Sequence, residues 1–218
     1  MNQVAALWQS TIGKKVAMAL TGVIMILFLI SHTISNDLIF VNPHHLDSYG
    51  AWLRSFGPLL WIARAGLLIT VVVHIVAASQ LTIRARNARP ATYDKREYRV
   101  ATYAARTMRW GGVLLAVFIV FHILHFTTGT FLPGWQEGKV GANVMLGFSS
   151  TPVAIFYVIA MLALGLHLSH GVWAAFQTLG INHPAYRGLR RGIAWTLAIV
   201  IAGGLATIPI AAMLGLLK

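Results

Sequence analysis

The most regular feature of the sequence is the alternation of long apolar stretches with short segments that carry the charges. Runs without Asp, Glu, Lys or Arg extend over residues 16–36, 65–83, 110–136, 140–186 and 192–217. Each run can hold the roughly 20 residues that an α-helix needs to cross the hydrocarbon core of a bilayer. The pattern predicts an all-α membrane protein, a bundle of five transmembrane helices.

The run from 140 to 186 is long enough for two spans, but its first part argues against them. Glycines, serines and Pro152 interrupt residues 141–152, and these residue types mark turns and helix starts. We therefore predict a polar-leaning loop over 140–150 and a single helix after it. The expected spans, within one membrane domain of residues 1–218, are about 13–36, 59–84, 107–130, 151–178 and 191–216.

The composition agrees with a membrane location and restricts the chemistry. Hydrophobic residues make up 57% of the chain and charged residues only 10%, against about a quarter charged in soluble proteins. The chain has no cysteine, which excludes a disulfide framework, a thiolate zinc site, a cysteine nucleophile and an iron–sulfur cluster held by this chain. Redox chemistry in this chain must therefore use other ligands.

The basic residues predict the orientation of the helices. Thirteen of the 17 Lys and Arg residues lie in the N-terminal segment through Lys15, in residues 84–109 and in residues 187–191. These segments share one side of a five-span chain, and Arg54, Arg64, Lys139 and Lys218 lie on the other. The positive-inside rule then places the N-terminus in the cytoplasm and the C-terminus outside a bacterial cytoplasmic (inner) membrane.

Residues 84–109 carry eight basic residues against Asp94 and Glu97. One interpretation is that this segment contacts anionic lipid and fixes the topology. The other is that it also docks a soluble partner. Neither interpretation needs nucleic acid, because the segment has few aromatic side chains on which bases could stack.

Histidines are the candidate functional residues. Six of the nine lie inside the predicted spans, and they are His32, His74, His122, His125, His167 and His170. Ionisable groups are costly in hydrocarbon and are functional candidates there. Counted from the outer ends of the spans at about 1.5 Å per residue, His32 and His122 lie about 8 and 10 Å deep, and His74 and His167 about 24 and 22 Å. The depths predict two pairs on two levels about 14 Å apart, as in a dihaem bundle.

Paired histidines suit haem iron, because two neutral imidazoles fill both axial positions and leave an electron carrier without an open site. A non-haem di-iron centre is the competing interpretation, since His122/His125 and His167/His170 are i, i+3 pairs. It is disfavoured because no carboxylate lies within the predicted membrane interior. A proton relay through His125 and His170 stays open. A transporter would need inverted repeats and broken helices, which the sequence lacks.

Several short motifs, taken in order, carry a family resemblance. They are STIGKK at 10–15, LISH at 29–32, VHIV at 73–76, FHILHF at 121–126, GLHLSHG at 165–171 and AFQTLG at 175–180. With them the chain resembles the dihaem cytochrome b membrane subunit of succinate:quinone oxidoreductases, the succinate dehydrogenases and fumarate reductases. The resemblance implies a membrane anchor with two b haems and quinone as substrate. It also implies a flavoprotein subunit with FAD, which holds the dicarboxylate active site, and an iron–sulfur subunit with the clusters.

The resemblance also selects among neighbouring histidines. It implies His32, His74, His122 and His167 as the haem ligands and leaves His125 and His170 as additional residues. Those two would make a buried hydrogen bond or contact a haem propionate or quinone. His44, His45 and His183 are expected in solvated loops. The alternative function is a dihaem b subunit of another quinone-linked enzyme, such as a hydrogenase or formate dehydrogenase. A third hypothesis is a transporter or a purely structural anchor.

Two expectations concern the path of the electrons. The iron–sulfur subunit is expected on residues 84–109 and the N-terminal segment, because electrons from a cytoplasmic enzyme enter nearer His74 and His167. Quinone is expected at the outer side, since a second haem is otherwise superfluous, with a cytoplasmic-side pocket near Trp8, Ser10 and Arg84 as the alternative. The candidate proton-exchanging residues at the outer side are Asp37, Glu137, His44, His45 and His125.

Overall fold

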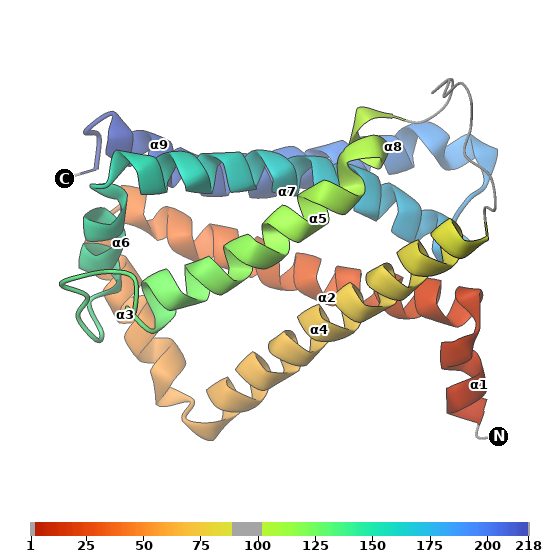
Figure 1. Ribbon diagram of the computed structural model, residues 1–218. Coiled ribbons are helices and arrows are strands. Elements are labelled where there is room, and N and C mark those ends of the chain that lie inside the picture. The colour runs from red at the N-terminus through yellow and green to blue at the C-terminus, as the bar shows by residue number, and fades with distance from the viewer. Residues whose placement is uncertain (1–2, 89–101, 218) are drawn as a thin grey trace.

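The computed structural model describes residues 3–88 and 102–217, and every regular element within them is a helix (Figure 1). Five helical stretches are long and apolar enough to cross a membrane, at Thr11–Phe40, Pro58–Asn87, Tyr103–Thr127, Thr151–Thr178 and Pro184–Met213. The prediction of an all-α membrane protein with five transmembrane helices is confirmed. The first and last helices, α1 (Gln3–Gln9) and α9 (Gly204–Met213), lie at opposite ends of the long axis.

Three of the spans contain a change of helix type. α2 (Thr11–Asn36) continues into a 3₁₀ turn at Asp37–Phe40, and α5 (Tyr103–His122) continues into a π-helical segment at Ile123–Thr127. α4 (Pro58–Asn87) and α7 (Thr151–Thr178) are regular. The last span comprises a 3₁₀ turn at Pro184–Tyr186, α8 (Arg187–Ala198), a π-helical segment at Ile199–Gly203 and then α9.

Side-chain caps and prolines fix where the spans begin. The hydroxyl of Ser10 accepts a hydrogen bond of 2.8 Å from the backbone N–H of Gly13, and Thr102 caps α5 through the N–H of Ala105. These bonds satisfy backbone donors that the first helical turn leaves without a partner. α4 begins at Pro58, and Pro152 is the second residue of α7. Proline is tolerated there because the N–H groups of the first helical turn have no partner within the helix.

A compact cap covers one end of the bundle. We define the cap as α3 (Pro43–Ser55), residues 128–139 and α6 (Val140–Phe148). The predicted loop over 140–150 was wrong for Val140–Phe148, because the glycines there permit close packing instead of turns. A Cβ on Gly141 would lie 2.5 Å from the carbonyl oxygen of Pro43, and the carboxylate of Asp47 accepts a 2.9 Å bond from the Gly141 N–H.

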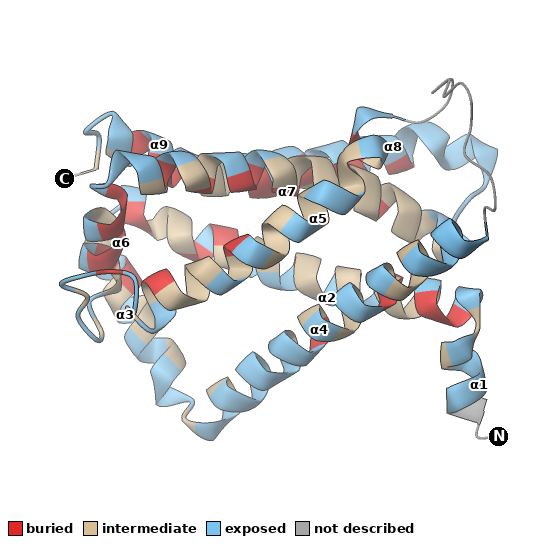
Figure 2. Ribbon diagram, in the orientation of Figure 1, coloured by how far each residue is buried: buried red, intermediate tan, exposed pale blue. Residues whose placement is uncertain are grey.

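The spans pack unevenly against one another. α2 lies along α4, α5 lies along α7, and the last span lies along α7. Among the five spans, buried residues are concentrated on α7 and the last span, whereas Thr70 and Ala77 are the only buried residues of α4 (Figure 2). Among the described helices, α2 is the only one against which α4 packs extensively. α2 and α4 therefore form one pair and α5 and α7 another, and α4 is the least enclosed of these four helices.

The end opposite the cap is basic. We call it the basic end, and its described cations are Lys14, Lys15, Arg84, Arg86, Arg106, Arg109, Arg187, Arg190 and Arg191. Helices occupy part of the expected 84–109 loop, since α4 runs to Asn87 and α5 begins at Tyr103. Residues 89–101 of that loop, with Asp94 and Glu97, lie outside the described residues.

Candidate cofactor site: two pairs of facing histidines

The four expected ligands come together in two pairs. His32 on α2 faces His122 on α5, with ring centres 5.9 Å apart and ring planes at 87°. His74 on α4 faces His167 on α7, with ring centres 6.3 Å apart and planes at 54°. These are the partners that the depth estimate matched. We call His32 and His122 the cap-side pair and His74 and His167 the basic-side pair.

The two pairs lie at different levels of the bundle. The Thr21 hydroxyl is 3.1 Å from Nδ1 of His74, and Thr21 precedes His32 by eleven residues on α2, about 16 Å of helix. On α5, a Cβ at Gly112 would lie 3.8 Å from the His167 ring, and Gly112 precedes His122 by ten residues, about 15 Å. Both helices therefore place the two levels about 15 Å apart, close to the separation of about 14 Å expected from the sequence.

Neighbouring polar groups lie close to Nδ1 in three of the four rings. Thr21 donates to the carbonyl of Ala17 at 2.7 Å, so its oxygen can accept from Nδ1–H of His74. The amide nitrogen of Asn36 is 3.3 Å from Nδ1 of His32, and the hydroxyl of Tyr157 is 3.3 Å from Nδ1 of His122. Nδ1 of His167 is buried and has no partner among the described residues. A group that accepts from Nδ1–H, as the hydroxyls of Thr21 and Tyr157 can, orients the ring and leaves Nε2 for a metal, whereas the amide nitrogen of Asn36 is a donor.

The geometry of both pairs fits a haem with two axial histidines. Two imidazoles on opposite sides of one iron, each with a nitrogen about 2 Å from the metal, have ring centres about 6 Å apart. Both measured spacings agree with that value. Within residues 3–88 and 102–217, no group of three or more His, Asp or Glu side chains gathers to hold a metal ion. The donor set thus matches the haem interpretation better than the di-iron one.

His125 and His170 have different surroundings from the four facing histidines. His125 is 1% exposed, its Nδ1 lies 3.0 Å from the Tyr157 hydroxyl, and it packs against the ring of Phe126. A Cβ on Gly147 would come within 2.8 Å of it. This is the buried hydrogen bond that was one of its expected roles. His170 is partly exposed on α7, one turn beyond His167.

The remaining histidines lie at the surface. His44 and His45 are exposed on α3, with His44 3.8 Å from Asp47, so they lie on a helix of the cap and not in a loop. His183 is exposed ahead of the 3₁₀ turn at Pro184, where its Nδ1 accepts a bond from the N–H of Ala185. None of the three lies near either pair.

Sequence reasoning missed Thr21 and Tyr157, although the depth estimate could have found both. Tyr157 follows Pro152 by five residues, which puts it about 8 Å deep, at the level of His32. Thr21 precedes Asp37 by sixteen residues, about 24 Å, at the level of His74. Applying the same arithmetic to every polar residue of the spans would have brought them to attention.

A half-buried carboxyl group lies five residues beyond His32 on the same span. Oδ1 of Asp37 is buried and has no hydrogen-bond partner among the described residues. Asp37 follows His32 on the same span, and α9 approaches it closely at Gly204, where a Cβ would lie 2.7 Å from Thr33 and 3.5 Å from Oδ2 of Asp37. Glycine at 204 thus permits the contact that covers this carboxyl group.

Residues 85–206 match the family model described as "Succinate dehydrogenase/Fumarate reductase transmembrane subunit". The chain belongs to this family. The match includes His122 and His167, one histidine from each pair, and ends within the last span. No curated protein and no solved structure matches the chain.

Membership establishes the general role of the chain. As a succinate dehydrogenase/fumarate reductase transmembrane subunit it is a multi-pass membrane anchor of the cytochrome b type and part of an oxidoreductase that works in electron transport. The family binds haem, and the facing histidines are residues of the type that ligate it.

Proposed function

We propose that this anchor carries two b haems and transfers electrons between the iron–sulfur subunit of its complex and membrane quinone. The dicarboxylate site would lie on the flavoprotein subunit. The presence of two facing histidine pairs on separate levels is the observation that supports this proposal most strongly. His32 and His122 would hold one haem, and His74 and His167 the other. Bound by two histidines, b haem carries single electrons and leaves no position for oxygen or substrate.

The basic end would face the bacterial cytoplasm and receive the iron–sulfur subunit. None of the acidic residues that the structure describes belongs to this end, so its described cations, of which all but Lys14 and Arg190 are at least partly exposed, give it one sign of charge. Arg84 donates to the Gln9 carbonyl at 2.7 Å, and Lys14 donates to the Trp8 carbonyl with its ammonium 4.8 Å from the Trp8 ring. These contacts fix α1 against the ends of α2 and α4 and support a common docking surface there.

The cap end would be the place where quinone reacts. A quinone site beside the basic-side pair would make the cap-side pair superfluous, whereas a site at the cap uses both levels. His44, His45 and Glu137 are exposed, and His125 is engaged with Tyr157. Asp37 differs, since burying a polar atom without a partner costs about 1–3 kcal/mol. We propose Asp37 as the group that exchanges protons with quinone.

The experiment is purification of the complex through a tag on this chain. We expect about two haems per chain by the pyridine haemochrome assay, a co-purifying flavoprotein and iron–sulfur subunit, and reduction of both haems by succinate. One haem per chain would contradict the two-pair assignment. Co-purification with a hydrogenase or formate dehydrogenase subunit instead would contradict the succinate-linked function.

A further inference from the structure

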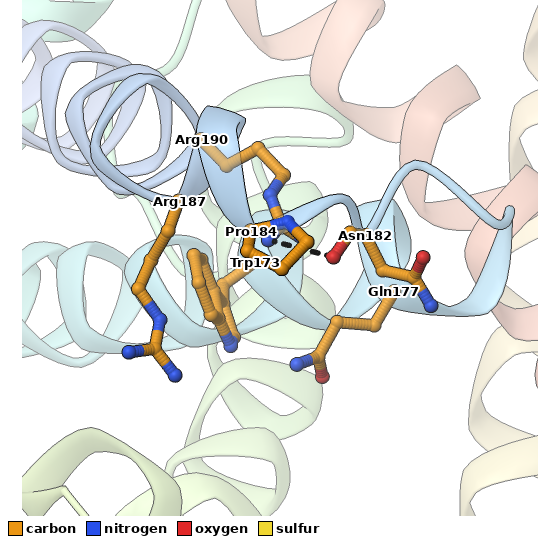
Figure 3. Close-up of a pocket in the computed structure, with 6 residues that line it drawn as sticks. All are labelled: Trp173, Gln177, Asn182, Pro184, Arg187 and Arg190. Atoms are coloured by element: carbon orange, nitrogen blue, oxygen red, sulfur yellow. Dashed lines mark hydrogen bonds between the residues drawn. The ribbon is translucent and has the colours of Figure 1, made fainter.

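A cavity of about 280 Å³ lies at the basic end between α7 and the start of the last span (Figure 3). Its lining residues are Trp173, Gln177, Asn182, Pro184, Arg187 and Arg190. None of them belongs to either histidine pair, and Arg187 and Arg190 are cations of the basic end. The cavity therefore needs a separate explanation.

The turn between α7 and α8 fixes one cation in the wall of this cavity. Gly180 ends α7 with φ +82°, and the N–H of Ile181 bonds to the Phe176 carbonyl at 2.9 Å. Arg190, 5% exposed, then donates to the carbonyls of Ile181 at 2.9 Å and Asn182 at 3.3 Å. Carbonyl groups satisfy its donors, and no carboxylate of the described residues pairs with its positive charge.

A second cation and an indole ring complete the lining. The Arg190 guanidinium lies 4.8 Å from the centre of the Trp173 ring. Arg187 and Gln177 are exposed, and Figure 3 shows their side chains on either side of that ring. The three described acidic residues, Asp37, Asp47 and Glu137, all belong to the cap end of the molecule. The cavity thus offers an anion the positive charge of Arg190, the guanidinium donors of Arg187 and the amide of Gln177.

We propose that this cavity binds the phosphate headgroup of an anionic phospholipid. Guanidinium groups are suited to phosphate oxygens, and basic pockets between transmembrane helices recognise anionic headgroups. Tryptophan is typical of the interfacial level at which headgroups lie. The volume is close to the lower end of the roughly 300–1,000 Å³ of small-molecule sites, so a phosphate with its glycerol fits better than a bare ion.

The outer face of α8 provides apolar surface for the rest of such a lipid. Leu189 is 62% exposed and Ile193 is 36% exposed, and both follow Arg187 within two helical turns. Acyl chains of a lipid held at the cavity can lie along this face. A free phosphate would use the arginines alone and gain nothing from the apolar surface or the indole.

The test is native mass spectrometry of the delipidated complex titrated with phosphatidylglycerol or phosphatidylcholine. Arg187→Ala should weaken phosphatidylglycerol binding about fivefold, the effect expected of one interfacial arginine. Arg191→Ala is the matched control, because Arg191 is an exposed arginine of the same helix that does not line the cavity. We expect this control to bind phosphatidylglycerol like the unmodified complex.

Four results would overturn the proposal. Equal weakening in both variants would show a general effect of surface charge, and equal binding of the two lipids would show no recognition of the headgroup. Displacement of phosphatidylglycerol by millimolar inorganic phosphate would identify a free-anion site. Loss of one haem in Arg187→Ala would assign the cavity to a haem propionate.

Discussion

The cap-side and basic-side pairs have similar ring spacings but different surroundings. Around His122 the rings of Phe118, Phe126 and Tyr157 lie 5.7 to 5.9 Å away, and the cap closes that end of the bundle. Around the basic-side pair, glycines approach the imidazoles, and a cavity of about 70 Å³ lies beside His167. The first environment is aromatic, and the second contains glycines and an open space.

The charges near the two pairs also differ. Nine described cations surround the basic end, whereas the cap end has the basic residues Arg54, Arg64 and Lys139 against three acidic ones. Two haems with the same ligands can differ in reduction potential because burial, nearby hydrogen bonds and nearby charges differ. The difference agrees with the two tasks proposed above, acceptance of electrons at the basic end and exchange of protons at the cap.

The largest expected effect comes from removing a ligand. His74→Ala or His167→Ala should abolish the basic-side haem and keep the other, and His32→Ala or His122→Ala should do the reverse, because each proposed pair would hold one haem. Reduced-minus-oxidised spectra measure the loss. In these single-haem variants, the basic-side haem should titrate at the higher potential.

His125→Ala and His170→Ala are the controls for ligand removal and should retain both haems. A haem lost in His125→Ala but kept in His122→Ala would reverse the ligand assignment on α5.

The glycines beside the basic-side pair give the next largest effect. A Cβ on Gly22 would lie 3.7 Å from His74, so Gly22→Leu would fill the space beside the imidazole and should remove the basic-side haem alone. Gly66→Leu on α4 is the matched control, because a Cβ there meets nothing within 4 Å. Haem content per chain is the measurement. Two haems in Gly22→Leu would show that this glycine does not border the cofactor.

A smaller effect is expected from the carboxyl group of Asp37, whose Oδ1 is buried. Asp37→Asn should lower quinone turnover about 100-fold, the lower end of the range for a general acid–base group. Succinate should still reduce both haems, because the electron path to the cap-side pair is intact. Glu137→Gln, an exposed acidic residue of the cap, should leave turnover unchanged. Normal turnover in Asp37→Asn would exclude Asp37 from proton exchange.

The smallest effects concern the hydroxyls that contact Nδ1. Tyr157→Phe should raise the potential of the cap-side haem alone, and Thr21→Val that of the basic-side haem alone, each on the order of tens of millivolts. Without an acceptor for Nδ1–H the imidazole is a weaker donor to ferric iron. Thr21→Ser keeps the hydroxyl and should restore the original value in a spectroelectrochemical titration. A shift of both haems by either variant would contradict separate environments.

Depth along the membrane normal could be predicted from the sequence, but rotation about each helix could not. The helical rise alone matched His32 with His122 and His74 with His167, because all four lie on uninterrupted apolar spans. The side of each helix that faces its neighbour depends on packing, which is why the contacts of Thr21 and Tyr157 appear only in the structure.

Two further differences have local causes. Gly141 and Gly147 suggested a loop because glycine favours turns, but it also permits close helix packing, and α6 uses the second property. The π-helical segment that contains His125 adds a residue to one turn, and no composition signal in the sequence marks it.

The isolation of α4 has a consequence for the biogenesis of the protein. α4 packs along α2, and the ring of its His74 lies 6.3 Å from that of His167 on α7. Insertion of the cofactor between His74 and His167 would therefore be a late step of folding that fastens the second span to the fourth. In cells starved of haem we expect newly made chains to hold α4 loosely, to be recognised by membrane proteases, and to fall in abundance before the soluble subunits do.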